Sequence, residues 1–496
     1  MPAFGFFPRN PHHARFFASV ADALKDQHEV DSLFIREMGE VPNQRVFEFE
    51  REIENQWHSF DISYEALQAL KNAFPEFNFM RAIYSEREFN FFPSYFGVRP
   101  VSCEHQLKYL VGCFSVFDQW LTNNSVEFVV SEMITGLADA VFKAVAEKRG
   151  IKYLSVRQSK VEPGLVVCDK FFDEPIGMLQ TYLEHLENGI PEPVKSRAME
   201  HISNLREKIN RPAYMEVTGK PLKLLTKKKL CLLVERIFND RIPSNSISAR
   251  RYPLLQPIGW ALFKKFNVWR TYLAKKKLFA SDVLEDERFF IFPLHYEPEA
   301  STAVRAFYFS DQLALIRLIA KVLPLGVKLV VKEHAGNQGY RKPEFYRELS
   351  YMHNVIMLPP HFDVFSLLRR CNGVITLTGR MGWEAIVNQK PVICLGQTFW
   401  SLLESVHRVE SWQELSSAIE QSCGAVPDKN YHCEKSILAF AAAYISCTYP
   451  GSFVLNTEQL GMPANINAFV EMLVDLRGSS EEKIGIDEMP AASRGN

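Results

Sequence analysis

Residues 373–396 read GVITLTGRMGWEAIVNQKPVICLG, and this stretch decides the fold of the region around it. A short β-rich run ends at Thr378-Gly379, a segment with helical spacing follows, and a second β-rich run begins at Pro391. Strand, helix and strand in direct succession predict a parallel α/β unit, because parallel strands need a crossover connection that is usually a helix.

The same alternation extends on both sides of this stretch, between residues 288 and 424. The further β-rich runs are FFIFPL (289–294), VKLVVKEH (327–334) and NVIMLP (354–359), and helical patterns such as SDQLALIRLIAKVL (310–323) separate them. This succession predicts a doubly wound parallel sheet.

A second α/β domain is predicted nearer the N-terminus. There, VEFVVSE (126–132), LADAVFKAVAEKRG (137–150) and IKYLSV (151–156) repeat the order strand, helix, strand. We therefore expect an α/β fold with two Rossmann-like domains. The predicted divisions are an N-terminal Rossmann-like domain at 1–173, a helical basic segment at 174–287, a C-terminal Rossmann-like domain at 288–445, a C-terminal helical segment at 446–478 and a disordered tail at 479–496.

The composition excludes several classes of protein. With 47% hydrophobic and 23% charged residues among 496, the chain matches a soluble globular protein and is long enough for two or three domains. Its nine cysteines include no Cys-x-x-Cys pair, which speaks against a disulfide framework and against a zinc site. No secretion signal and no apolar run of about 20 residues is evident. We expect a cytoplasmic protein, soluble or attached to a membrane surface.

The charge is unevenly distributed along the chain. The whole sequence has a formal charge of -1, yet residues 220–277 hold fifteen Lys or Arg against Glu235 and Asp240, a local charge of +13. Leu, Phe and Trp interleave with these cations, which is typical of a segment that binds an anionic membrane surface at the inner face of the plasma membrane. The alternative is a solvated basic face over ordinary core helices. A nucleic-acid partner is not expected, because no binding module accompanies the charge.

Titratable side chains follow the predicted strands of the C-terminal sheet. His295 comes after the first run, and Lys332 and His334 close the second. Ligands of open α/β sheets bind at the carboxyl ends of the strands, so these side chains are candidates for contacts to a phosphate or sugar oxygen. Each histidine could instead be partly buried and satisfied by the backbone.

The turn after the run GVITL is the most informative motif. Thr378-Gly379-Arg380-x-Gly382 at the start of a helix can present backbone N–H groups to an anion, with Arg380 adding a charged contact and Glu384 accepting hydrogen bonds from ribose hydroxyls. The alternative is that the glycines serve a tight turn and that Glu384 interacts with the helix dipole.

In the N-terminal domain, Glu132 follows the buried run VEFVVS. A carboxylate there could face the second domain across a cleft and act as a general base or a nucleophile, or it could cap the next helix. No metal site is predicted, since His12 and His13 lack acidic or cysteine partners at ligand spacing.

A resemblance to a known family rests on several of these motifs in order: FFIFPLHYEPEAST (289–302), VVKEH (330–334), YRKPEFYREL (340–349), NVIMLPP (354–360), TLTGRMGWEA (376–385) and KPVICLG (390–396). Together they resemble the capsule polysaccharide biosynthesis family, which includes Kdo-type and other bacterial surface-glycan glycosyltransferases with a GT-B arrangement. The sequence differs from the family at two positions, with Ala335 in place of the usual proline after His334 and Arg380 in place of a small polar residue.

The resemblance implies two facing Rossmann-like domains, a nucleotide-sugar donor held by the second domain, a glycan or lipid-linked glycan acceptor in the cleft, and neither a metal nor another cofactor. CMP- and UDP-linked donors are both expected candidates. Two other functions remain open: a sugar-nucleotide epimerase-like enzyme, and a non-catalytic factor of capsule assembly or export. The predicted roles are catalysis for Glu132 and His295, and nucleotide-sugar binding for Lys332, His334, Thr378, Gly379, Arg380, Gly382 and Glu384.

Overall fold

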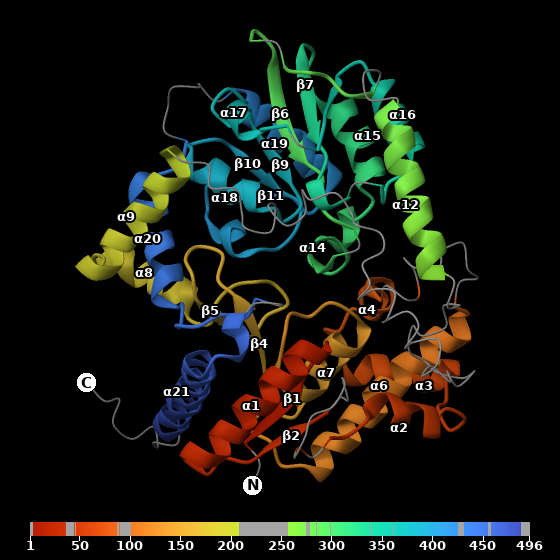
Figure 1. Ribbon diagram of the computed structural model, residues 1–496, viewed down its shortest axis with the longest axis vertical. Helices are drawn as coiled ribbons and strands as arrows, with labels where there is room; N and C mark the ends of the chain where they lie inside the picture. Colours follow the sequence, from red (N-terminus) through yellow and green to blue (C-terminus); the bar gives the residue numbers. More distant parts are fainter. Residues whose placement is uncertain are drawn as a thin grey trace.

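The computed structural model describes residues 3–487 apart from 36–43, 45, 87–88, 90–100, 208–255, 274–277, 284, 298, 338, 361, 425–430 and 455–457. Two α/β domains lie one above the other, with the N-terminal domain below in the view of Figure 1. The predicted pair of Rossmann-like domains is therefore confirmed.

The N-terminal sheet has the order β2-β1-β3-β4-β5, and its neighbours are parallel except for the antiparallel pair β4 and β5. The reversal of strand order falls between β1 and β3. The strands span β1 (Phe4–Phe7), β2 (Ser32–Phe34), β3 (Phe128–Ser131), β4 (Lys152–Gln158) and β5 (Leu165–Cys168). The strand β1 was not predicted, since its sequence FGFF lacks the β-branched residues that mark the predicted strands.

Helices cover both faces of this sheet because its strands are apolar on both sides. Phe6 faces α1 and α21, whereas its neighbour Phe7 faces α6 and α7. α1 starts at Asn10, whose side chain accepts hydrogen bonds from the first N–H groups of the helix. The helices are α1 (Pro11–His28), α2 (Phe49–Asn55), α3 (Tyr64–Ala73), α4 (Phe79–Ser85), α6 (Cys103–Asn123) and α7 (Leu137–Lys148).

The C-terminal sheet is parallel throughout, with the order β11-β10-β9-β6-β7-β8. This confirms the predicted doubly wound sheet, and its reversal of strand order falls between β6 and β9. The strands are β6 (Arg288–Pro293), β7 (Val327–Lys332), β8 (Val355–Leu358), β9 (Gly373–Thr376), β10 (Val392–Cys394) and β11 (His407–Arg408). The helices are α14 (Ala300–Ala303), α15 (Gln312–Val322), α16 (Pro343–Ser350), α17 (Phe365–Leu368), α18 (Arg380–Val387) and α19 (Trp412–Gly424).

Three further helices connect the domains. α20 (Glu434–Ser446) packs against α8 (Met178–Asn188) and α9 (Glu192–Glu207), and their side chains join the C-terminal core. The last helix, α21 (Pro463–Asp487), returns to the N-terminal domain and lies beside α1 (Figure 1). The chain therefore crosses between the domains more than once, and a helix assigned by the structure continues past residue 479, where the disordered tail was predicted to begin.

The structure describes only part of the predicted helical basic segment. α12 (Gln256–Leu273) lies along the side of the C-terminal domain next to α16 (Figure 1), whereas 208–255 and 274–277 lie outside the described residues. Within the described part of the chain, no helix combines the length and apolar character that crossing a membrane requires.

Candidate functional site

The residues predicted for the site gather at the carboxyl edges of the two sheets, where the strand order reverses. In the C-terminal sheet this point lies between β6 and β9, and in the N-terminal sheet it lies between β1 and β3. At such a point the connections that leave the two neighbouring strands run in opposite directions, which leaves a crevice at the carboxyl ends of these strands. Each domain thus holds one predicted group of side chains at its own reversal point.

His295 follows β6 and lies against the turn that follows β9. Its Nε2 accepts a hydrogen bond from the main-chain N–H of Thr378 at 3.3 Å, so the ring proton is assigned to the buried Nδ1. Burial is the main cause that lowers the pKa of His295 to about 3, the charges of His334, Arg341 and Arg305 act in the same direction, and a hydrogen bond to the backbone of Pro293 acts against them. The imidazole is therefore neutral near pH 7 and holds the turn in place.

The turn after β9 is tightly packed. The N–H of Gly379 donates to Thr376 Oγ1 at 3.2 Å, and the Thr378 hydroxyl donates to the carbonyl of Ser301 at 3.3 Å. A Cβ on Gly379 would lie 2.8 Å from Thr376 Oγ1 and 3.1 Å from His295 Nε2, so glycine is required there by the close approach. Gly379 is the N-cap of α18 but supplies no side-chain hydrogen bond to the helix.

Arg380 and Glu384 lie one turn apart on α18. Arg380 Nε is 3.5 Å from Glu384 Oε1, and the side chain of Glu384 is only 7% exposed. Burial raises the pKa of Glu384 to about 7, against the opposing charge of Arg380. The carboxyl group is thus close to half protonated at neutral pH.

Gly382 has a packing role in the structure. A Cβ at this position would lie 2.4 Å from the ring of Trp400, so the glycine permits α18 to approach the segment after β10. This contact agrees with the alternative interpretation of the motif, in which a glycine serves the close packing after the turn.

The edge of β7 is organised by a buried ion pair that sequence reasoning missed. Glu333 is fully buried and accepts hydrogen bonds from Arg341 Nη1 and from the Tyr346 hydroxyl, both at 2.7 Å. Arg341 Nη2 also donates to the carbonyl of His295 at 2.9 Å, which joins the loops after β6 and β7. No local sequence pattern marks Arg341, because its partners come from other strands.

The two predicted binding residues of β7 flank Glu333. Lys332 is the last residue of the strand and is buried. His334 Nδ1 accepts a hydrogen bond from the N–H of Gly336 at 3.1 Å, and burial lowers the pKa of His334. Because β7, β6 and β9 are adjacent in the sheet, the loops that carry Lys332, His295 and Thr378 lie side by side.

Glu132 forms a second group at the reversal point of the N-terminal sheet. It accepts hydrogen bonds from the main-chain N–H of Arg9 at 3.1 Å and from Asn10 Nδ2 at 3.2 Å, and its Oε1 is 2.6 Å from His13 Nδ1. The buried ring of His13 stacks on Phe453 with centroids 4.1 Å apart, while its Nε2 has no partner in the structure. Sequence reasoning had found no acidic partner for His13, since Glu132 is distant along the chain.

The alternative role for Glu132, capping the following helix, is wrong. The N–H groups of Thr135 and Gly136 at the start of α7 donate to Asp139 instead, at 3.1 and 3.2 Å. Glu132 is therefore available to the polar group formed with Arg9, Asn10 and His13.

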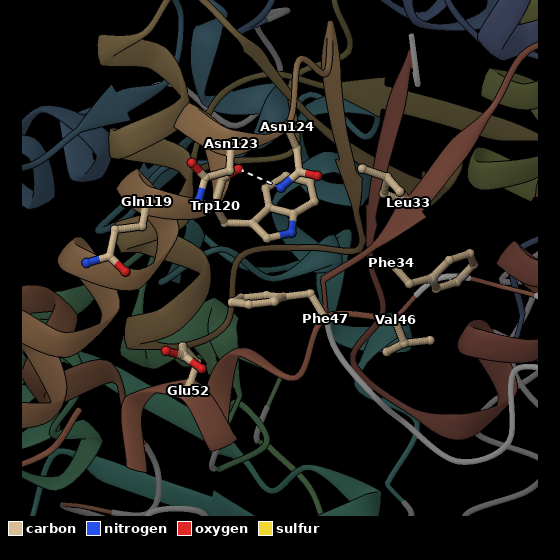
Figure 2. A pocket seen from close by; sticks show the side chains of 9 residues that line it. All are labelled: Leu33, Phe34, Val46, Phe47, Glu52, Gln119, Trp120, Asn123 and Asn124. Atoms are coloured by element: carbon tan, nitrogen blue, oxygen red, sulfur yellow. Dashed lines mark hydrogen bonds between the residues drawn. The ribbon is translucent and has the colours of Figure 1, made fainter. Parts of the chain in front are cut away.

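A hollow of about 440 Å³ lies elsewhere in the N-terminal domain (Figure 2). Figure 2 shows apolar and amide side chains around it, with Glu52 as the one titratable group among them. The lining residues are Leu33, Phe34, Val46, Phe47, Glu52, Gln119, Trp120, Asn123 and Asn124. None of them was predicted as functional. Among the described residues, no group of three or more His, Cys, Asp or Glu side chains is placed to hold a metal ion.

Several solved structures are similar to this chain at low identity. KpsC of Thermosulfurimonas dismutans, a beta Kdo 2,7 transferase, is 13% identical, with 72% of this chain and 88% of that chain covered and a TM-score of 0.30. The UDP-GlcNAc 2-epimerase of Methanocaldococcus jannaschii is 11% identical, with 88% and 98% covered and a TM-score of 0.28. These values carry no inference about activity. A search of curated protein sequences finds no match.

A family model gives the more specific finding. The model described as capsule polysaccharide biosynthesis protein matches residues 231–413. This range holds the whole C-terminal sheet, from β6 to β11, together with His295, His334 and the turn from Thr378 to Glu384. The resemblance predicted from the sequence is thereby confirmed for residues 231–413, the segment in which this chain is similar to the capsule polysaccharide biosynthesis family.

Proposed function

We propose that the protein is a GT-B-type glycosyltransferase that moves a sugar from a nucleotide-sugar donor to a capsule or other surface glycan, without a metal ion. The observation that supports this most is the convergence of His295 with the Thr378-Gly379 turn at the reversal point of the sheet in the family-matched segment. Nucleotides bind at such points in doubly wound folds.

The proposed donor site lies between α18 and the end of β7. The N-terminus of α18 offers N–H groups without a side-chain cap, and Arg380 and Lys332 supply positive charge. Sugar transfer breaks the bond between the anomeric carbon and a phosphate oxygen, and the electron pair leaves with that oxygen. Fixed cations and backbone N–H groups stabilise the departing phosphate. CMP and UDP are the nucleotides we propose to test first.

His295 is proposed to act as a neutral positioning residue in this site. With Nε2 accepting from the N–H of Thr378, the ring fixes the turn that would contact the donor. A pKa of about 3 makes the ring a weak base, so it positions the donor and does not take the proton of the acceptor.

Glu132 is proposed as the general base. The acceptor hydroxyl oxygen forms the new bond to the anomeric carbon while its proton passes to the Glu132 carboxylate, which Asn10 and His13 hold in position. Glu132→Gln preserves the shape and removes the basic oxygen.

The experiment pairs nucleotide binding with transfer. We expect Arg380→Gln to weaken the binding of CMP or UDP, and Glu132→Gln to leave nucleotide binding unchanged while abolishing acceptor-dependent transfer. Arg51→Gln, at an exposed site of the N-terminal domain, is the matched control and should change neither. An unchanged transfer rate in Glu132→Gln would remove the catalytic assignment.

The same measurements of nucleotide binding and sugar transfer distinguish the two other candidate functions. A product formed from a nucleotide sugar without acceptor would indicate an epimerase-like enzyme. Absence of nucleotide binding would indicate a non-catalytic role in capsule assembly or export. No observation in the structure favours either over sugar transfer.

We further propose that the protein is cytoplasmic and docks on anionic lipid at the inner face of the plasma membrane through 220–277. α12 supports this, since Leu262, Phe266, Trp269 and Leu273 are each more than half exposed and fall on one stripe of the helix. The other side of α12 is held on the domain, where buried Asn267 donates to the carbonyl of Gly339 at 3.2 Å.

Vesicle flotation tests the membrane proposal. We expect binding to phosphatidylglycerol-containing vesicles and not to phosphatidylcholine alone, because both the apolar stripe and the local positive charge contribute. Phe266→Glu with Trp269→Glu should abolish flotation, whereas Tyr64→Glu, at a more exposed aromatic residue of α3, should not. Flotation that survives the double substitution would contradict a docking role for α12.

A further inference from the structure

Four charged side chains meet where the two domains touch, apart from the groups described above. Arg157 is the last residue but one of β4, and Lys160 follows that strand. Asp173 follows β5, and Arg305 comes from the C-terminal domain after α14. Arg305 Nη1 lies 3.0 Å from Asp173 Oδ2, and Lys160 Nζ contacts the same oxygen. We call these four residues the junction cluster.

The junction cluster carries an excess of positive charge. Lys160 and Arg305 contact the one carboxylate, and their charges, with that of Arg157 nearby, hold the pKa of Asp173 far below its usual range, against the effect of burial. The other titratable groups that face Arg157 are Cys168, Tyr444 and Tyr153. Burial raises the pKa of Cys168 and of Tyr153 to about 12 and also raises the pKa of Tyr444, so none of the three adds negative charge near pH 7.

Among the residues that the structure describes, none offers the guanidinium of Arg157 a hydrogen-bond acceptor. The residue is 6% exposed, and its Nε, Nη1 and Nη2 atoms are all buried without an acceptor. Buried polar groups are nearly always paired, and a guanidinium matches the planar oxygens of a carboxylate or phosphate. The structure therefore leaves Arg157 without the carboxylate or phosphate group that its guanidinium could bind.

The junction cluster borders the proposed donor site. The carbonyl of Arg305 accepts a hydrogen bond from the N–H of Gln397 at 3.1 Å, and Gly396 lies close to both Arg305 and Thr378. The charge of Arg305 also contributes to the lowered pKa of His295. The side chain of Lys160 is 35% exposed, whereas Arg157, Arg305 and Asp173 are buried.

We propose that Arg157, Lys160 and Arg305 form an oxyanion-binding subsite at the domain junction, which holds a phosphate or carboxylate group of a molecule bound between the domains. Asp173 holds the cations together when the subsite is empty. Binding gives the guanidinium of Arg157 its missing acceptors and involves no change in covalent bonds. The inference rests on the proposed function only for which molecule carries the oxyanion.

Thermal unfolding of the full chain tests anion binding directly. Sodium phosphate and sodium glucuronate are titrated against sodium chloride at equal ionic strength, and a saturable rise of Tm is expected for at least one of the two oxyanions. A response to phosphate assigns the group to a nucleotide or phosphorylated acceptor, and a response to glucuronate assigns it to an acidic sugar. No saturable rise with either anion would overturn the proposal.

Arg157→Met provides the decisive variant. Methionine removes a buried charge without a partner, so the variant should be at least as stable as the wild type in chloride while losing the response to the oxyanion. Lys160→Gln, at a partly exposed position, should bind the anion at least about tenfold more weakly. This second variant keeps the test valid if Arg157→Met does not fold. Arg51→Met should keep the full response.

A response retained in Arg157→Met and Lys160→Gln would refute the subsite. Arg380→Gln distinguishes the oxyanion subsite from the donor site. If only Arg380→Gln abolishes the response to the oxyanion, the anion binds at α18, and the proposed subsite is refuted. The two proposals fail separately: nucleotide binding with no oxyanion response at Arg157 leaves only the transferase, and the reverse result leaves only the subsite.

Discussion

Replacing Glu384 by glutamine should stabilise the protein in alkaline solution and have little effect in acid. Its side chain is 7% exposed inside α18, and Arg380 Nε lies 3.5 Å from its carboxylate. Burial raises the pKa of Glu384 from 4.5 to about 7. An acid with a raised pKa binds its proton more tightly in the folded chain, so the unfolded chain gains from ionisation before the folded chain does.

The size of the effect follows from this difference in pKa. Each pKa unit corresponds to about 1.4 kcal/mol, so ionisation of Glu384 costs about 3 kcal/mol of the free energy of unfolding once the pH exceeds 7. The loss begins as the pH rises through 4.5 and is still below about 1 kcal/mol at pH 5. Glutamine has nearly the same shape and no charge, and so avoids the loss.

Urea unfolding of wild type and Glu384→Gln at pH 5 and pH 8.5 measures the difference. The two proteins should be similarly stable at pH 5, whereas the variant should be more stable by about 3 kcal/mol at pH 8.5. Glu65→Gln, at an exposed position of α3, is the control and should show no such change. A gain in Glu384→Gln that is the same at both pH values would refute the reasoning, because packing and not ionisation would then be responsible.

Two further substitutions test the packing around the candidate site. Gly382→Ala should destabilise the C-terminal domain by about 1–3 kcal/mol in urea unfolding, since its Cβ would lie 2.4 Å from Trp400, while Gly478→Ala in α21, with open space around it, should be neutral or stabilising. Arg341→Met should cost about 3–5 kcal/mol by the same assay, because it leaves the fully buried Glu333 without its counter-ion. Adding Glu333→Gln to Arg341→Met should recover part of that loss, and no recovery would show that the charge of Glu333 is not the cause.

The C-terminal sheet was the most predictable part of the fold. Strands such as β7 and β9 are short apolar runs rich in β-branched residues, bounded by turns, so each has a local signal. β11 has only two residues, and β1 (Phe4–Phe7) reads FGFF, without the β-branched residues that mark the other strands. Their place in a sheet depends on the neighbours with which they pair.

The candidate site was predictable in part. His295, His334 and Thr378 were named because they follow strands, and parallel strands end at one edge of a sheet. The role of His295 was harder to predict from the sequence. Its neutral ring and its hydrogen bond to Thr378 depend on β6 and β9 being neighbours. Residues that act through distant partners, such as Arg341 with Glu333, left no local pattern.

By itself, the sequence determined the class of this protein: two parallel α/β domains, a basic segment of +13 at 220–277 in a nearly neutral chain, and motifs of one family. These follow from local periodicity and composition, which neighbouring residues set. Only the tertiary structure decided the strand order, the pairing of Glu132 with His13, and the ion pair between Asp173 and Arg305 from the other domain. The physical reason is that ionisation and hydrogen bonding depend on burial and on partners far along the chain, which exist only once the sheets have formed.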